Sequence, residues 1–261
     1  MATLPSPITR RINGYETSLL DVGTGPRVLV THGGWIGNWE LWKRPAAELS
    51  ARGWRVIAFD HRGSGSSTAP VTNLDDMVDD LFAVMDHCGV EQCVLAGESM
   101  GSLVVERAVA RDPGRFTHLV VVAGAARFPR TPPIRAFGVG LRRAYDPTLR
   151  LFVRLATPER DAGRAIREWG LRFLRLAEPQ AARALFTLLA GTDQRELVSS
   201  INVPTLVIHG AADLIVPLPF ARELVRLQPH AKLVVLPWVG HVPTMTRSTR
   251  ICDEIERFTI A

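Results

Sequence analysis

The stretch QCVLAGESMGSLVVERAVA (residues 92–110) decides the fold of this chain. Its first six residues are mostly apolar, which is typical of a short strand buried on both faces. The residues that follow Ser99 carry the apolar pattern of a helix. Between the two lies GESMG (residues 97–101), which matches GxSxG, the pattern of a tight strand-to-helix turn. This context predicts that Ser99 is a nucleophile whose hydroxyl stands above the end of a strand.

Short apolar runs alternate with helical patterns along most of the remaining chain. This alternation predicts an α/β fold with a mostly parallel sheet and helices on both faces. Two early segments, 9–13 and 17–22, predict an antiparallel hairpin, which brings the expected sheet to eight strands. The six strands expected to be parallel lie at residues 27–32, 54–60, 92–97, 118–123, 205–210 and 232–236.

The alternation stops between residues 126 and 201, where no convincing strand occurs. This part shows amphipathic helical patterns instead, for example over Ala162–Leu176 and Pro179–Ala190. Ligands of open parallel sheets bind at the carboxyl ends of the strands, so an insertion there would wall off a pocket. We therefore expect a core formed by residues 1–125 and 202–261, and a helical cap formed by residues 126–201.

Two further polar residues follow predicted strands in the second half of the chain. Asp213 comes after the strand TLVIHG, and His241 comes after the strand KLVVL. Together with Ser99 they occur in the order Ser, Asp, His, each at the carboxyl end of a different strand. We expect His241 to accept the Ser99 proton and Asp213 to hold the imidazole tautomer. Glu98 and Glu106 are rival acids, but they lie on the nucleophile's own turn and helix, where reach to His241 is poor.

A glycine loop, HGGW (residues 32–35), ends the first strand of the expected parallel sheet. Acyl transfer needs backbone N–H groups that point at the developing oxyanion. We expect these donors to be the N–H of Met100 and the N–H of Gly34, with Trp35 as the second choice for the latter. His32 is interpreted as structural, with its ring holding the loop by a hydrogen bond.

The motifs, taken together and in order, resemble those of the α/β-hydrolase superfamily across nearly the whole chain. The resemblance implies the α/β-hydrolase fold and a serine-nucleophile member, similar to small esterases, lactonases and carbon–carbon bond hydrolases that carry a helical cap. It also implies that the loop after the 54–60 strand is structural and lines one side of the pocket. The matching motifs are HGG (32–34), DHRGSGS (60–66), GESMG (97–101), GAAD (210–213) and GH (240–241).

The chain also departs from its relatives in informative ways. Similar haloalkane dehalogenases and epoxide hydrolases use an aspartate nucleophile, so serine at position 99 excludes those reactions. Members often carry an acidic residue shortly after the His-x-Pro sequence, whereas this chain has TMTR (residues 244–247). We expect this difference to alter the local helix cap without affecting the chemistry.

Aromatic residues beside the motifs and in the expected cap predict an apolar pocket. Candidate substrate contacts are Trp35, Trp169, Trp238 and Phe128. The leading hypothesis is hydrolysis of a hydrophobic carboxylic ester or lactone through an acyl-enzyme on Ser99. Alternatives with the same triad are carbon–carbon bond hydrolysis and cofactor-free perhydrolysis, and a third is a ligand receptor with slow turnover.

The charge and the cysteine content limit which partners, metals and cofactors are expected. The net charge is +5, and residues 127–200 hold 14 arginines against 7 acidic residues, at spacings typical of a solvated helical face. The three cysteines suit neither a disulfide framework nor a zinc site, so we expect no metal and no cofactor. No secretory signal or membrane span is recognised, which predicts a cytoplasmic protein. The helical spacing of the arginines predicts that it binds no nucleic acid. The oligomeric state is not defined by the sequence.

Overall fold

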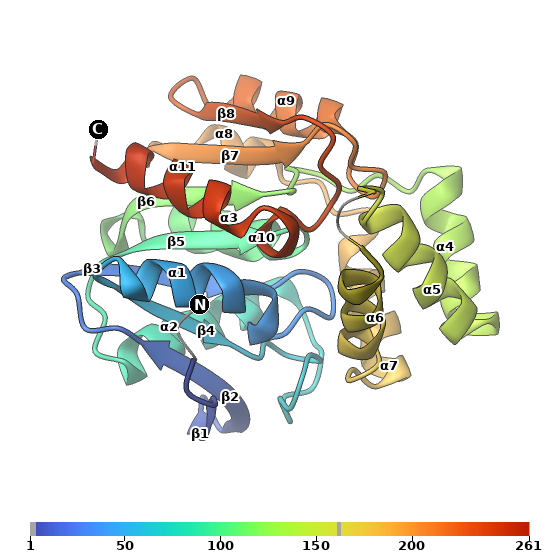
Figure 1. The fold of residues 1–261 in the computed structure, drawn as a ribbon, viewed down its shortest axis with the longest axis horizontal. Coiled ribbons are helices and arrows are strands. Elements are labelled where there is room, and N and C mark those ends of the chain that lie inside the picture. Colours follow the sequence, from blue (N-terminus) through green and yellow to red (C-terminus); the bar gives the residue numbers. More distant parts are fainter. Residues whose placement is uncertain (1–3, 161–162, 261) are drawn as a thin grey trace.

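The computed structural model describes residues 4–160 and 163–260, so the predicted helix start at Ala162 lies outside the described residues. Its centre is an eight-stranded sheet in the order β1-β2-β4-β3-β5-β6-β7-β8 (Figure 1). The predicted fold class and strand positions are confirmed, with ends that shift by up to two residues. The strands are β1 (Ile8–Ile12), β2 (Tyr15–Val22), β3 (Arg27–His32), β4 (Trp54–Phe59), β5 (Cys93–Glu98), β6 (Phe116–Val122), β7 (Thr205–Gly210) and β8 (Lys232–Leu236).

Only one edge of the sheet is antiparallel. β1 pairs with β2, and β2 pairs with β4, in antiparallel register, while every other neighbouring pair is parallel. Asn13 and Gly14 form the two-residue turn between β1 and β2 with φ of 49° and 84°. Such a turn needs left-handed backbone at both positions, which asparagine and glycine tolerate best.

Helices cover both faces of the sheet (Figure 1). α1 packs against α10 and α11 on one side, whereas α2, α3, α8 and α9 pack in sequence on the other. In the described ranges, no helix is long and apolar enough to cross a membrane. These helices are the 3-10 helix η1 (Trp39–Trp42), α1 (Lys43–Ala51), α2 (Leu74–His87), α3 (Gly101–Arg111), α8 (Arg195–Ser199), α9 (Leu218–Leu227), α10 (Pro243–Thr246) and α11 (Ser248–Ile260).

Four helices between β6 and β7 lie together at one end of the sheet (Figure 1). They are α4 (Pro132–Arg143), α5 (Tyr145–Ala156), α6 (Gly163–Leu174) and α7 (Pro179–Leu189), and we call them the helical insertion. A short antiparallel bridge between Arg127 and Asp193 closes its base. α8 follows these helices and packs against α3 and α9.

Candidate active site

Ser99 lies in the turn between β5 and α3 with a φ of +56°, a left-handed conformation that is strained for serine. The Ser99 N–H donates to Val122 O at 2.9 Å, which ties the turn to β6. A Cβ on Gly97 would lie 2.7 Å from Gly101 O, and a Cβ on Gly101 would lie 2.5 Å from Gly33 O. Glycine is therefore required on both sides of the serine, as the motif predicts.

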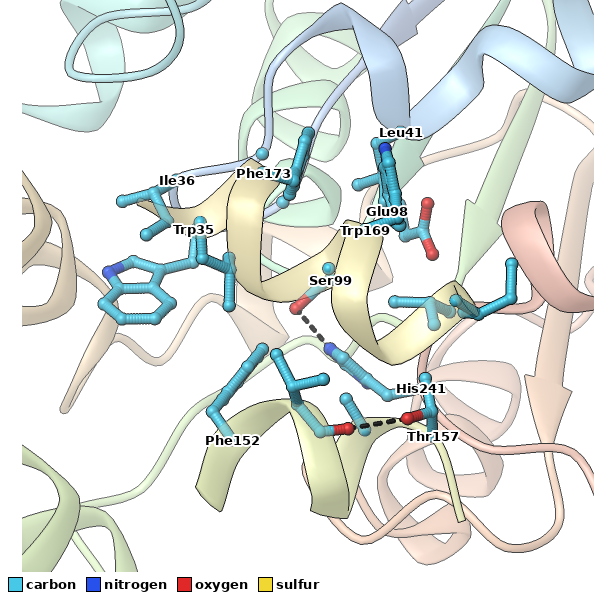
Figure 2. Close-up of a pocket in the computed structure, with 18 residues that line it drawn as sticks. Trp35, Ile36, Leu41, Glu98, Ser99, Phe152, Thr157, Trp169, Phe173 and His241 are labelled. Atoms are coloured by element: carbon cyan, nitrogen blue, oxygen red, sulfur yellow. Dashed lines mark hydrogen bonds between the residues drawn. The ribbon is translucent and has the colours of Figure 1, made fainter. Parts of the chain in front are cut away.

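The structure brings Ser99, His241 and Asp213 into one hydrogen-bonded chain. Ser99 Oγ lies 2.9 Å from His241 Nε2 (Figure 2), and His241 Nδ1 lies 2.7 Å from Asp213 Oδ2. The carboxylate can only accept, so Nδ1 carries the proton and Nε2 is free to accept from the serine. Asp213 Oδ1 accepts from the N–H groups of Ile215 and Val216 at 2.8 and 2.9 Å. These bonds orient the carboxylate toward the imidazole.

His209 holds the segment that carries Asp213. Its Nε2 donates to Val216 O at 2.7 Å and lies 3.4 Å from Asp213 Oδ2. Burial lowers the pKa of His209, which favours the neutral ring. His209 therefore helps to hold Asp213 in position and adds no charge at neutral pH.

The loop after β3 lies directly against the serine. A Cβ on Gly34 would lie 3.1 Å from Ser99 Cβ and 3.7 Å from Ser99 Oγ, so only glycine permits this approach. Gly34 O accepts from Gly37 N at 2.9 Å and from His61 Nε2 at 3.0 Å. Within the described part of the chain, the N–H groups of Gly34 and Met100 donate to no acceptor. Two backbone donors near Ser99 are thus left available.

His32 packs beneath this loop. Its Nδ1 donates to Gly33 O at 2.8 Å, and its ring stacks on His61 with centroids 4.7 Å apart. Burial, and then the neighbouring His61, lower the pKa of His32 to about 3. A neutral, fully buried ring that bonds to the loop fits the expected structural role.

A pocket that is partly open to solvent lies between the serine turn and the helical insertion. Most of its walls are apolar side chains from the loop after β3, from η1, and from helices α5 and α6 (Figure 2). The lining residues are Gly34, Trp35, Ile36, Gly37, Leu41, Glu98, Ser99, Phe152, Val153, Ala156, Thr157, Ile166, Trp169, Gly170, Phe173, Leu174, His241 and Val242.

Two of the four aromatic candidates lie on this pocket and two do not. Trp35 and Trp169 line it, and their indole N–H groups donate to Ala182 O and Glu40 Oε2. Phe128 is buried in the core away from the lining residues. Trp238 is 84% exposed on the loop after β8. The structure therefore does not support ligand contacts by Phe128 or Trp238 in this pocket.

The loop at residues 60–66 also differs from its expected place, since none of its residues lines the pocket. Asp60 instead accepts from Trp39 N at 3.2 Å and from Ser66 N at 2.7 Å. His61 bonds to Gly34 as described above. The 60–66 loop therefore contacts the glycine loop through His61 and does not itself line the pocket.

Sequence reasoning missed a contact between the helical insertion and the histidine loop. His241 N donates to Ala156 O at 2.8 Å, at the end of α5. Gly240 N donates to Glu159 Oε1 at 2.8 Å, and Thr246 Oγ1 donates to the same oxygen at 3.1 Å. Glu159 is 82 residues before His241, and no local pattern links the two.

Glu98 and Glu106 are both buried, and neither forms a hydrogen bond with His241. Glu98 Oε2 accepts from Thr244 Oγ1 at 2.7 Å, whereas Glu106 accepts from Gln194 Nε2. Burial raises the pKa of Glu98 well above its usual range and that of Glu106 to about 8. Glu106 therefore favours the neutral form at pH 7, and burial shifts Glu98 in the same direction.

An eight-stranded sheet with a serine on a strained turn, and with acid and histidine at later strand ends, is the arrangement of the α/β-hydrolase class. Comparison with known proteins agrees. A family model described as serine aminopeptidase, S33 matches residues 26–244. The AB hydrolase superfamily protein YisY from Bacillus subtilis (strain 168) is 30% identical over 255 residues, covering 92% of this chain and 93% of the relative.

Two further similar proteins, one matched by its sequence and one by its structure, are both named as esterases. The pimeloyl-[acyl-carrier protein] methyl ester esterase of Aliivibrio salmonicida (strain LFI1238) is 27% identical, covering 90% of this chain and 93% of the relative. The esterase EaEST from Exiguobacterium antarcticum superposes with a TM-score of 0.91 at 20% identity, covering 98% of this chain and 100% of that chain. The chain therefore belongs to the α/β-hydrolase superfamily, in the family described as serine aminopeptidase, S33, and it is a hydrolase.

Proposed function

We propose that this hydrolase cleaves carboxylic esters or lactones of hydrophobic small molecules through an acyl-enzyme on Ser99. The observation that carries the proposal is the hydrogen-bonded chain from Ser99 through His241 to Asp213, which ends in an apolar pocket. An apolar pocket favours a hydrophobic acyl or alcohol group over a charged one. The ester chemistry of the relatives is consistent with this substrate class.

In the proposed reaction, Ser99 Oγ attacks the ester carbonyl carbon while His241 Nε2 takes the serine proton. The N–H groups of Gly34 and Met100 donate hydrogen bonds to the carbonyl oxygen and stabilise the negative charge that develops on it. His241 then gives the proton to the leaving alkoxide, which departs as the alcohol. Water, deprotonated by the same nitrogen, attacks the acyl-enzyme carbonyl, and His241 returns that proton to Ser99 Oγ as the carboxylic acid is released. Asp213 stabilises the imidazolium in both halves.

We further propose that the helical insertion acts as a cap. Its helices α5 and α6 supply much of the pocket wall, and Trp35 of the core is bonded to α7 through Ala182. A cap of this kind would exclude bulk water and select the substrate by shape.

The experiment is an assay with p-nitrophenyl esters of short to medium acyl chains. We expect turnover by the wild type, and a loss of at least about 1000-fold in kcat for Ser99→Ala, because the nucleophile is removed. Ser50→Ala, which removes a serine hydroxyl from α1 outside the pocket, is the matched control and should retain activity. Equal turnover by wild type and Ser99→Ala would contradict the proposal.

A further inference from the structure

One side-chain oxygen of a residue that lines the pocket has no partner among the described residues. Ser99 and His241 bond to each other, and Thr157 Oγ1 donates to Val153 O at 2.7 Å. Glu98 uses only Oε2, which accepts from Thr244. Among the described residues, its buried Oε1 has no hydrogen-bond partner. Leaving a buried polar atom without a partner is unfavourable, and this one belongs to the residue beside the nucleophile.

The surroundings of Glu98 decide which form of the carboxyl meets a ligand. The side chain is 1% exposed, and the groups that face it are Thr244 on α10, the Asp213 carboxylate and His241. Burial raises the pKa of Glu98 most, the charge of Asp213 raises it further, and the Thr244 bond only partly opposes them. With Thr244 donating to Oε2, a proton on this carboxyl sits on Oε1, and that atom can then donate a hydrogen bond.

We propose that Glu98 Oε1 recognises the substrate by donating a hydrogen bond to a neutral oxygen in it, such as an ether, hydroxyl or ketone oxygen. This inference rests on the proposed function and narrows its substrate class to esters or lactones with a second oxygen function on an otherwise apolar skeleton. Figure 2 shows the Glu98 carboxyl on the opposite side of Ser99 from the Trp35 indole, so the second oxygen lies away from Trp35.

A neutral oxygen fits this wall better than a cation does. A substrate ammonium would lose its hydration among apolar side chains and would have to ionise Glu98 close to the existing charge of Asp213. A neutral acceptor only has to meet the donor already present. Removal of the donor should therefore affect oxygen-bearing substrates selectively.

The test compares p-nitrophenyl hexanoate with a series in which one methylene of the acyl chain, at successive positions, is replaced by an ether oxygen. Binding is measured by tryptophan fluorescence in a Ser99→Ala background, so that it does not depend on turnover. We expect one position of the oxygen to bind about 3-fold to 10-fold more tightly than its neighbours, as a single hydrogen bond allows. The Glu98→Leu change should abolish this preference.

Two variants separate recognition from a structural role. Glu98→Gln keeps a donor and should retain part of the preference. Glu106→Gln changes a buried glutamate that does not line the pocket, and it should leave the preference intact. Melting temperatures show whether each variant is folded.

A series without a preferred oxygen position, or an unchanged preference in Glu98→Leu, would overturn the inference. Preferential binding of an ammonium-bearing ester would overturn it as well. Failure of the proposed function looks different, because it would be an absence of turnover of every ester by the wild type.

Discussion

Glu159 Oε1 accepts a hydrogen bond from the N–H of Gly240 at 2.8 Å, one residue before His241. A Cβ on Gly240 would lie 2.5 Å from the backbone oxygen of Ala156, so glycine permits this close approach. His241 N is held at the same time by Ala156 O. The helical insertion therefore does more than cover the pocket, because it fixes the backbone that carries the histidine.

Loss of the Glu159 carboxylate should release this backbone. We expect Glu159→Ala to lower kcat by about 10-fold to 100-fold with a smaller change in KM, because a small misplacement of a general base is costly. Glu159→Gln keeps an acceptor oxygen and should retain most activity. Glu178→Ala removes an exposed glutamate before α7 and serves as the control. Steady-state kinetics on one ester checks this, and equal kcat in Glu159→Ala and the control would contradict it.

The Asp213→Asn variant should lose activity through the wrong imidazole tautomer. Oδ1 accepts from two backbone N–H groups, so the amide nitrogen of asparagine would replace Oδ2 beside His241 Nδ1. That nitrogen donates, which moves the ring proton to Nε2 and blocks acceptance from Ser99. We expect kcat to fall by about 10³-fold to 10⁴-fold. Asp193→Asn is the control, and a loss below tenfold at Asp213 would argue against this role.

Trp169 should set the size limit of the pocket. Its indole lies on the wall, stacked on Phe173 with centroids 4.7 Å apart. Trp169→Ala should raise the ratio of kcat/KM for decanoate over butyrate p-nitrophenyl esters by about 10-fold, since the pocket gains apolar space. Trp238→Ala removes an exposed indole outside the pocket and should leave the ratio unchanged. The same shift in both variants would contradict this assignment.

Stability should depend on pH through Glu106. Burial raises its pKa from 4.5 to about 8, so between these values the folded chain binds a proton that the unfolded chain has lost. The free energy of unfolding therefore falls as pH rises through this window, by up to about 1.4 kcal/mol per pH unit from this group. Glu106→Gln removes the titration and keeps an acceptor for Gln194.

Urea denaturation at pH 5, 6, 7 and 8 measures this dependence. All other titratable groups are the same in both proteins, so the difference between wild type and Glu106→Gln isolates the one carboxyl. The variant should gain stability relative to the wild type as pH rises. A difference that is constant with pH would show that Glu106 is not protonated in the folded chain.

The sheet and the three residues at its strand ends were predictable because both follow from local pattern. Ser99, Asp213 and His241 each lie within five residues of the end of a strand, and parallel topology brings such positions to one edge. The glycine loop at Gly34 was predictable for the same reason. The structure adds distances, not a new choice of residues.

The supports of the site were not predictable, because they join segments far apart in the chain. Glu159 and Gly240 are 81 residues apart in the chain, and His61 reaches Gly34 across β4 and β3. Trp238 is the opposite case, because its place in the sequence suggested a substrate contact that the structure does not support. It is next to the histidine loop in sequence, but its φ of +60° turns the chain and its indole is exposed.

The central claim concerns the reactivity of one hydroxyl, and labelling with a fluorophosphonate measures it most directly. Intact mass spectrometry followed by peptide mapping should show one adduct per chain, located on Ser99, and no adduct in folded Ser99→Ala. A folded wild type that turns over esters without an adduct, or with the adduct on another residue, would contradict the account.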